Sequence, residues 1–235
     1  MKFSLLSHPP DRVWCWMLLF CLGGIFPAPA FAAPPSIVNL DGDGDIISAT
    51  SREQKRPAIG YDGLSHLVVW EDSSGSASDL VALRVDEDGD VLDPLPFTIT
   101  AATGTQLEPA VAGSWAGWLV VWADYRTGTG DIYGARVDPE GRLLDPDGII
   151  INKGARDQRS PQVVWNGQEY LVVWTDFGTS ATSDIVGARV SADGRVIDTD
   201  GFMIGAGEYA SAGPVLSWGD SSYLLVWQTL RPEGD

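Results

Sequence analysis

The chain repeats itself with a period of about 52 residues, and this period limits its fold more than any other feature. A tryptophan closes an apolar run in each copy, at spacings of 52, 52 and 53 residues: Trp70, Trp122, Trp174 and Trp227. Prolines and, in three copies, a later Asp and Arg keep the same step: Pro57, Pro109, Pro161, Pro214, Asp79, Asp131, Asp184, Arg84, Arg136 and Arg189. Periods of this size are typical of solenoids, propellers and other arrays.

One repeat contains four strand-like runs separated by turn sequences. In the third copy these runs are residues 161–165, 170–174, 184–190 and 195–204. Asn166-Gly167 lies between the first two runs, and this dipeptide favours a tight hairpin because both residue types tolerate positive φ. Short links make consecutive strands antiparallel neighbours. Each repeat therefore predicts a four-stranded meander, which is the size of one propeller blade.

The second run of each repeat is apolar at every position instead of alternating. These runs are residues 67–70, 119–122, 171–174 and 224–227. A strand has this pattern when both of its faces are buried, and a propeller blade is sandwiched between two others. Solenoids of parallel strands usually repeat faster, and a β-sandwich does not need an identical motif at every period. We therefore predict an all-β, propeller-type array of four-stranded antiparallel blades.

The period also divides the chain into units. We assign residues 1–33 to a signal peptide, 34–56 to the last strand of a preceding or closing blade, 57–108, 109–160 and 161–213 to three complete blades, and 214–235 to two strands of a fourth. The fourth unit lacks its third strand, which leaves an apolar strand poorly covered. We expect a longer array that continues past this chain. The alternative is a four-bladed ring closed by residues 36–47 together with 214–227.

The first 33 residues have the pattern of a secretory leader. Lys2 and Arg12 precede an apolar run over residues 13–26, and small residues around Ala32 form an A-x-A cleavage site. The apolar run is shorter than the ~20 residues that a membrane span needs. We therefore expect a secreted or cell-surface protein with no membrane insertion after the leader is removed.

Cysteine content and charge exclude several classes of function. Both cysteines, Cys15 and Cys21, lie in the leader, which excludes a disulfide scaffold, a thiol nucleophile and a zinc–thiolate site in the mature chain. Removal of the leader leaves 13 basic and 31 acidic residues. This acidic excess argues against nucleic acid or an anionic membrane as partner and suits a soluble exported protein or one that binds cations.

At YLVVWTD and DIVGARVSADGRVID, residues 170–176 and 184–198, and at their copies, the chain resembles the tandem repeats of secreted bacterial β-propeller-like proteins. The resemblance covers nearly all of the mature chain. It implies export and a non-catalytic surface or binding role, and it supplies no catalytic residues. The signatures of WD, kelch and sialidase propellers are missing.

One acidic and one basic position recur together in three repeats. The acidic residues are Asp72, Asp124 and Asp176, and the basic residues are Arg84, Arg136 and Arg189. One interpretation is a ring of carboxylates around a ligand. The other is a structural pair in each repeat, in which the Asp takes a bidentate bond from the Arg across the hairpin. An active site needs one constellation and not a copy per blade, so we predict structural pairs.

Acidic turns offer candidate calcium ligands at Asp41, Asp43, Asp45, Asp145, Asp147, Asp198 and Asp200. Carboxylates at alternate positions can converge on one cation. The first run fails the EF-hand pattern, because Ile46 and Arg52 stand where Gly and Glu are required. Asx turns explain these sequences without a metal. No cofactor is predicted, and calcium is kept as a hypothesis.

His66 is the one histidine outside the leader, and its counterparts are Trp118, Tyr170 and Tyr223. We therefore expect it to fill an aromatic packing position, and no G-x-S-x-G sequence accompanies it as a hydrolase nucleophile. Aromatics at Tyr61, Trp165 and Trp218 stand beside the first hairpin turn, where blade packing or sugar stacking would use them.

These observations predict a non-catalytic extracellular propeller module that binds an unknown protein or glycan or has a structural or adhesive role. One alternative is an incomplete part of a secreted propeller enzyme that acts on glycans, with its catalytic residues elsewhere. Another is a calcium-dependent adhesion module. We predict no catalytic residues in this chain.

Overall fold

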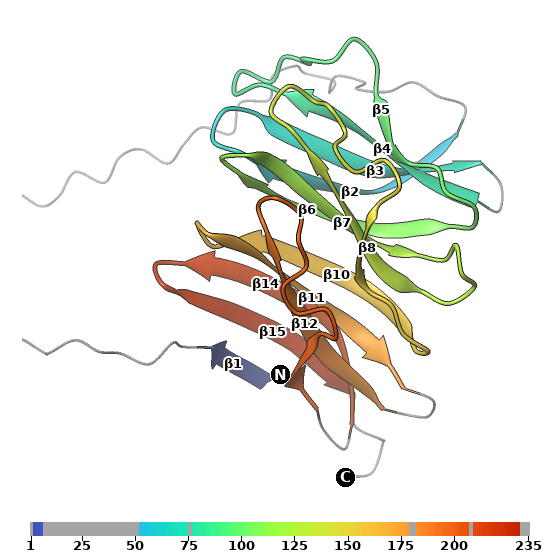
Figure 1. The fold of residues 1–235 in the computed structure, drawn as a ribbon, viewed down its shortest axis with the longest axis vertical. Helices are drawn as coiled ribbons and strands as arrows, with labels where there is room; N and C mark the ends of the chain where they lie inside the picture. Colours follow the sequence, from blue (N-terminus) through green and yellow to red (C-terminus); the bar gives the residue numbers. More distant parts are fainter. Residues whose placement is uncertain (1, 7–51, 75–76, 179–181, 207–208, 231–235) are drawn as a thin grey trace, which may run out of the picture. The chain divides into compact units, whose positions relative to one another are not determined.

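The computed structural model describes residues 2–6, 52–74, 77–178, 182–206 and 209–230, and the described residues form four antiparallel β-sheets (Figure 1). The first sheet contains β2 (Glu53–Tyr61), β3 (His66–Ser74), β4 (Ala77–Val85) and β5 (Phe97–Thr100). The second contains β6 (Gln106–Ser114), β7 (Gly117–Asp124), β8 (Asp131–Val137) and β9 (Ile149–Asn152).

The third sheet contains β10 (Asp157–Trp165), β11 (Glu169–Phe177), β12 (Ser183–Ser191) and β13 (Phe202–Gly205). The fourth contains β14 (Ala210–Gly219) and β15 (Ser222–Leu230), with β1 (Lys2–Leu6) paired antiparallel to the other side of β15. Three sheets thus have their strands in chain order, and the fourth is partial. The prediction of an all-β array of four-stranded antiparallel blades is confirmed. Residues 7–51, with most of the predicted leader, lie outside the described residues.

The first strand of each sheet begins three or four residues before its proline and carries a β-bulge there. The residue before the proline has positive φ in all four sheets: Arg56 at 48°, Glu108 at 57°, Ser160 at 53° and Gly213 at 59°. The first run of each repeat was predicted to begin at the proline, which has no N–H to donate to the ladder. The proline can stand inside the strand because the bulge leaves one residue unpaired, and the strand continues on both sides of it.

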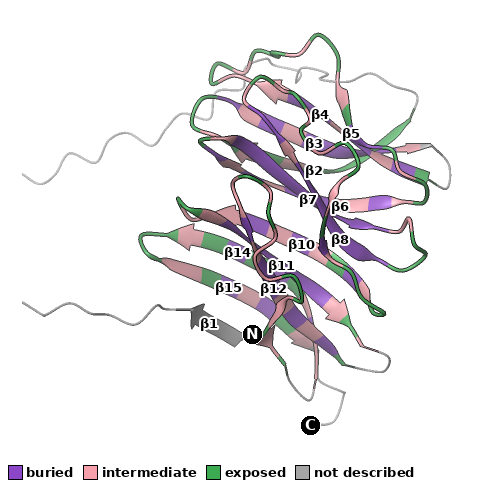
Figure 2. Ribbon diagram, in the orientation of Figure 1, coloured by how far each residue is buried: buried purple, intermediate pink, exposed green. Residues whose placement is uncertain are grey.

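The second strands are buried on both faces, as their unbroken apolar pattern predicts. Every residue of β7 is buried, and Figure 2 shows the burial along its whole length. Leu67, Leu119 and Leu171 hold the same position in three sheets and are at most 2% exposed. Their counterpart in the fourth sheet, Leu224, is 45% exposed. This position of the second strand is therefore buried in the first three sheets and partly exposed in the last one.

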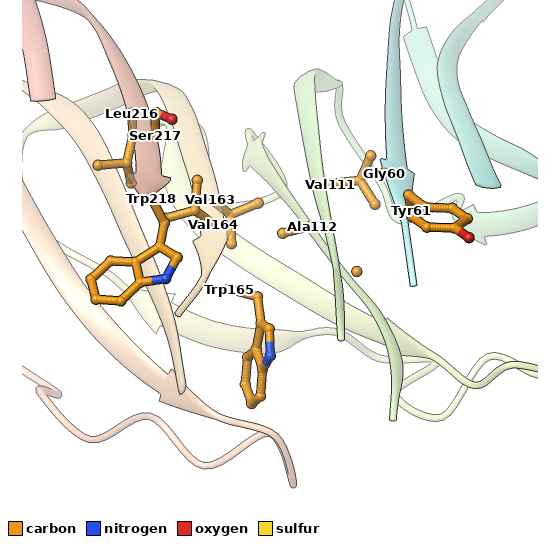
Figure 3. Close-up of a pocket in the computed structure, with 11 residues that line it drawn as sticks. Gly60, Tyr61, Val111, Ala112, Val163, Val164, Trp165, Leu216, Ser217 and Trp218 are labelled. Atoms are coloured by element: carbon orange, nitrogen blue, oxygen red, sulfur yellow. The ribbon is translucent and has the colours of Figure 1, made fainter. Parts of the chain in front are cut away.

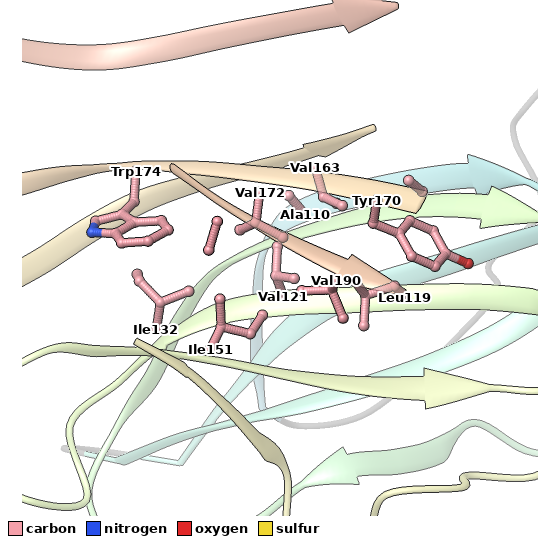
Figure 4. Close-up of a cluster of buried hydrophobic side chains, with 12 residues drawn as sticks. Ala110, Leu119, Val121, Ile132, Ile151, Val163, Tyr170, Val172, Trp174 and Val190 are labelled. Carbon is pink, nitrogen blue, oxygen red and sulfur yellow. The ribbon is translucent and has the colours of Figure 1, made fainter. Parts of the chain in front are cut away.

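Neighbouring sheets pack face to face through three equivalent apolar clusters, always in the same direction. Trp174 packs on Val121, Ile132 and Ile151 of the preceding sheet (Figure 4). The other two clusters hold Trp122 against the first sheet and Trp227 against the third. The tryptophan that defines the period therefore faces the sheet before its own. Apolar burial of this kind stabilises a fold by roughly 25 cal/mol per Å².

A polar contact accompanies each apolar cluster at the residue just before the apolar run. The Nε1 of Trp118 donates to the carbonyl of Gly60 at 2.9 Å, and the hydroxyl of Tyr170 donates to Ser114 Oγ at 2.7 Å. In the last sheet, Asn166 Nδ2 donates to the hydroxyl of Tyr223 at 2.6 Å. Each contact links a second strand to the hairpin of the preceding sheet. These buried or partly buried polar groups thus find partners on the neighbouring sheet.

Candidate functional site

A pocket of about 350 Å³ lies between the first strands of all four sheets, and we call it the central pocket (Figure 3). It is lined by Gly60, Tyr61, Val111, Ala112, Gly113, Val163, Val164, Trp165, Leu216, Ser217 and Trp218. β2, β6, β10 and β14 are neighbours in that order. The pocket is therefore built by residues that recur at three consecutive positions of the repeat, two to four residues after its proline.

Three aromatic side chains from the ends of first strands contribute to the central pocket. Trp165 and Trp218 come from the neighbouring strands β10 and β14 and are half-buried, and Tyr61 comes from β2 and is 43% exposed. Their rings are supported from behind by ring contacts in the same hairpin, Trp165 on Tyr170 at 4.7 Å and Trp218 on Tyr223 at 4.6 Å. Such tilted pairs hold each indole in place and leave another part of it open to solvent.

The lining of the central pocket holds few groups that could act as an acid or a base. None of its eleven residues is charged, and its polar side chains are those of Ser217, Tyr61 and the two tryptophans. The Tyr61 hydroxyl donates a hydrogen bond to Glu87, and this bond, more than burial, raises the pKa of Tyr61. His66 contacts the ring of Tyr61 with 4.8 Å between centroids. The predicted packing position of His66 beside the second strand agrees with this contact.

Two carboxylates lie at the bulges of the first strands, and both bind backbone amides. Glu71 is 1% exposed and accepts hydrogen bonds from Arg56 Nη1 at 3.1 Å and from the Glu108 N–H at 2.7 Å. The Glu108 carboxylate in turn accepts the Ser160 N–H at 2.6 Å. Each bond joins one sheet to the next. These groups therefore satisfy the strained bulge backbone instead of pointing into open space.

The predicted pairing of the recurrent Asp and Arg residues is wrong. Arg136 does not bind Asp124; it binds Asp145, with Nε at 2.8 Å and Nη2 at 2.8 Å from the carboxylate. Arg84 and Arg189 bind Asp93 and Asp198 in the same way. In each case the aspartate also accepts the arginine's own backbone N–H.

Strand register explains the correction. Arg136 lies opposite Leu119, whereas Asp124 lies opposite Asp131. Asp124 is five residues further along the strand than Leu119, or about 17 Å at ~3.4 Å per residue. The turn after β8 instead returns Asp145 to Arg136, where a bidentate bond forms.

The remaining aspartates form facing pairs across the second and third strands. Asp72, Asp124 and Asp176 lie opposite Asp79, Asp131 and Asp184. Arg156 Nη1 bridges Asp176 and Asp184 at 3.5 and 3.3 Å, and Arg52 is 3.8 Å from each member of the first pair. In the second sheet, Arg126 and Trp122 Nε1 bind Asp124, and Thr127 binds Asp131. Like charges that face one another thus share one arginine in the first and third sheets and have separate donors in the second.

The candidate calcium ligands are not gathered into a cation site in the described part of the chain. Asp145 and Asp198 chelate arginines, and Asp147 offers its backbone carbonyl to Arg126 Nη1 at 3.0 Å. Among the described residues, no three Asp, Glu, His or Cys side chains converge as a metal site would require. Asp41, Asp43 and Asp45 lie outside the described residues.

Sequence reasoning missed a glutamine that joins two sheets. Gln158 is 1% exposed; its Oε1 accepts the Ile132 N–H at 3.2 Å, and its Nε2 donates to Asn152 Oδ1 at 2.5 Å. Glutamines also stand three residues before the proline in the two earlier repeats, as Gln54 and Gln106. The recurrence of glutamine every 52 residues is the sequence signal from which this contact between sheets could have been predicted.

Solved structures with a similar fold are β-propeller glycoside hydrolases, and the similarity is distant. An α-L-arabinofuranosidase from Lactobacillus brevis superposes with a TM-score of 0.50 at 12% identity, over 74% of this chain and 64% of that protein. A GH43 endo-arabinanase from Bacillus licheniformis matches with a TM-score of 0.45 at 12% identity, over 77% and 74% of the two chains. An endo-arabinase from Bacteroides thetaiotaomicron gives 0.47 at 12% identity, over 79% and 80%.

The fold is that of a β-propeller. At this identity the similarity concerns the arrangement of sheets alone, and the chain spans just under two thirds of the arabinofuranosidase. No protein-family model matches the sequence, and no curated protein matches it either. Within the described residues, no helix has the length and apolar character needed to cross a bilayer.

Proposed function

We propose that this chain is an exported, non-catalytic binding module of the propeller type, and that its central pocket binds an uncharged glycan. The observation that carries the proposal is the pair Trp165 and Trp218, which present supported, half-open indole rings to one uncharged pocket. A sugar ring has flat apolar faces that stack on indole and hydroxyl groups at its rim. A concave, mostly apolar wall with few polar groups suits such a ligand.

Charge supports an uncharged ligand. The chain has a formal net charge of −17, so an anionic glycan would be repelled as it approached. The pocket lining contains no arginine or lysine that would offset this repulsion. Neutral polysaccharides meet no such barrier. The leader pattern and the resemblance to secreted repeat proteins support export, which would bring the module to extracellular polymers of this kind.

Catalysis is not part of this proposal, because glycoside hydrolysis uses two carboxyl groups on either side of the scissile bond. The pocket lining has no carboxylate, and Glu71 and Glu108 are already bound to backbone amides of neighbouring strands. The alternative remains that this chain is one part of a glycan-active propeller enzyme. It differs from the first proposal in one measurable result, the release of reducing ends.

The test is tryptophan fluorescence titration of the protein with soluble arabinan, xylan and cellotriose, together with a reducing-end assay. We expect Trp165→Ala and Trp218→Ala each to weaken binding by about tenfold or more, equivalent to ~1.4 kcal/mol. Trp115→Ala is the matched control, because Trp115 is 74% exposed and does not line the pocket. Equal effects of all three variants, or no binding, would contradict the proposal. Release of reducing ends would favour the enzyme alternative.

A further inference from the structure

Trp165 and Trp218 hold the same position of the repeat, four residues after its proline. Each lies directly opposite a tyrosine of its own hairpin, Trp165 opposite Tyr170 and Trp218 opposite Tyr223. The two ring pairs have nearly the same geometry, with 4.7 and 4.6 Å between centroids and 56° and 57° between planes. The open part of each indole therefore has the same place relative to its own sheet.

Each supporting tyrosine is also bound to the preceding sheet at one equivalent point. The Tyr170 hydroxyl donates to Ser114 Oγ at 2.7 Å, and Asn166 Nδ2 donates to the Tyr223 hydroxyl at 2.6 Å. Ser114 and Asn166 are themselves counterparts, one repeat apart. The indole of the fourth sheet is thus placed on the third sheet as the indole of the third sheet is placed on the second. One step of the array relates the two indoles.

This relation decides how one ligand can contact both indoles. Two indoles that enclose a single sugar must turn their open faces toward each other. Indoles related by one step of an array turn their open faces in the same sense, and facing sheets lie about 10 Å apart, which is longer than one sugar ring. Figure 3 shows the two side chains next to one another on one side of the central pocket. They are therefore placed to contact different sugars of one chain.

The second sheet has no aromatic side chain at this position of the repeat. Gly113 stands there, and a Cβ built on it would overlap the backbone carbonyl of Tyr61. The backbones of β2 and β6 are too close at this point for any side chain to fit between them. The row of indoles therefore ends at Trp165 and has two members in the described part of the chain.

We propose that Trp165 and Trp218 are successive platforms for one linear glycan chain, each stacked on a different sugar unit. The ligand class is then a linear homopolymer or its oligosaccharides, because such a chain presents equivalent sugar faces at regular steps, as the repeat presents equivalent indoles. This inference rests on the proposed binding of an uncharged glycan in the central pocket. It adds that affinity should depend on the length of the chain.

The test is isothermal titration calorimetry of the full 235-residue chain with xylose, xylobiose, xylotriose and xylohexaose, and with the matching arabinose series. We expect affinity to rise at least tenfold from the monosaccharide to the longest oligosaccharide, because the second contact becomes intramolecular once the first sugar is bound. Trp165→Ala and Trp218→Ala should each abolish this gain, since a single platform then remains.

Conservative variants and a distant tryptophan serve as controls. Trp165→Tyr and Trp218→Tyr should retain most of the gain with length, because each keeps an aromatic platform. Trp115→Ala should retain all of it, because Trp115 does not line the central pocket. Far-ultraviolet circular dichroism of every variant should match that of the parent.

The possible results separate this inference from the proposed function. If the monosaccharide binds as tightly as the longest oligosaccharide and both alanine variants lose that binding, one sugar lies between the two indoles, and serial platforms are ruled out while glycan binding stands. A gain with length that persists in both alanine variants would also overturn the inference and leave glycan binding intact. Absence of binding in both series would overturn the inference and the proposed function together.

Discussion

The guanidinium of Arg84 lies against Gly141 of the next sheet while it binds Asp93 of its own. A Cβ built on Gly141 would be 2.7 Å from Arg84 Nε, and Arg84 Nη1 donates to the carbonyl of Pro139 at 2.7 Å. The same relationship recurs one repeat later, where a Cβ on Gly194 would be 2.6 Å from Arg136 Nε. The arginine thus joins an aspartate in its own sheet to a glycine turn in the following one.

Replacement of either turn glycine by alanine should destabilise the protein. Gly141 and Gly194 have φ of +83° and +86°, which costs an L-residue about 1–2 kcal/mol, and overpacking against the guanidinium adds about 1–3 kcal/mol. Gly63→Ala and Gly167→Ala are controls for the backbone cost alone, because both have positive φ and no atom within 4 Å of the added Cβ. Urea denaturation measures the difference. Equal losses in all four variants would show that the arginine contact contributes nothing.

The contribution of the arginine should depend on whether a turn covers it. The Arg136 side chain is 23% exposed, whereas Arg189, with no such turn over it in the described residues, is 44% exposed. We expect Arg136→Met to lower the free energy of unfolding by about 2–3 kcal/mol, since a charged group in a largely buried pair loses its partner. Arg189→Met should cost less than about 1 kcal/mol, as exposed pairs do. Chemical denaturation of both variants checks this order, which equal losses would contradict.

The stability that Asp198 contributes should disappear in acid. The hydrogen bond from Arg189 lowers the pKa of Asp198, against a smaller opposing effect of burial. A carboxyl whose pKa is lower in the folded than in the unfolded state stabilises the fold above the unfolded value of ~3.9 and loses this effect as pH falls through the folded value. The stability difference between the parent and Asp198→Asn should therefore be largest near neutral pH and shrink below about pH 4.

Denaturation at several pH values measures this difference. Asp200→Asn is the control, since Asp200 is exposed and belongs to the same turn. A difference for Asp198→Asn that persists unchanged in strong acid would show that charge plays no part in the pair.

Two tryptophans at the same position of the repeat should respond differently to replacement by phenylalanine. Trp122 and Trp174 are both fully buried, but Trp122 Nε1 donates to Asp124 Oδ2 at 2.8 Å, whereas Trp174 Nε1 has no hydrogen-bond acceptor among the described residues. Loss of volume is the same in both variants. Trp122→Phe removes one donor from a buried carboxylate as well, so we expect it to cost about 1–2 kcal/mol more. Thermal or urea unfolding tests the difference, and a larger loss for Trp174→Phe would contradict it.

Tyr170 should ionise only in strong alkali, and its ionisation should weaken the fold. Burial raises its pKa to about 12, and hydrogen bonding to Ser114 acts in the opposite direction with a smaller effect. A raised folded pKa means that the stabilising effect is complete below the unfolded value of ~10 and is lost as pH rises toward 12. Spectrophotometric titration of phenolate should show one fewer late-titrating tyrosine in Tyr170→Phe. Loss of an early-titrating group instead would contradict this assignment.

Local patterns predicted the strands of each sheet, because the formation of a strand depends on a short stretch of sequence. The apolar second runs predicted strands buried on both faces, and β7 is buried at every residue. His66 was expected in an aromatic position, and its ring contacts Tyr61. The proline, by contrast, indicated the start of a strand and instead marks a bulge inside it. Proline shows that a ladder bond is missing, but it does not show whether the strand ends or bulges there.

The sequence by itself determined the period, the four strands of each repeat and the burial of the second strand, because these follow from side-chain alternation and turn residues. Only the tertiary structure decided that Arg136 binds Asp145 and not Asp124, since both aspartates are available in the sequence and register alone separates them. It also decided which faces stay open. Ile59 and Val163 occupy one position of the repeat, yet they are 63% and 7% exposed, because burial depends on a neighbouring sheet that no local pattern describes.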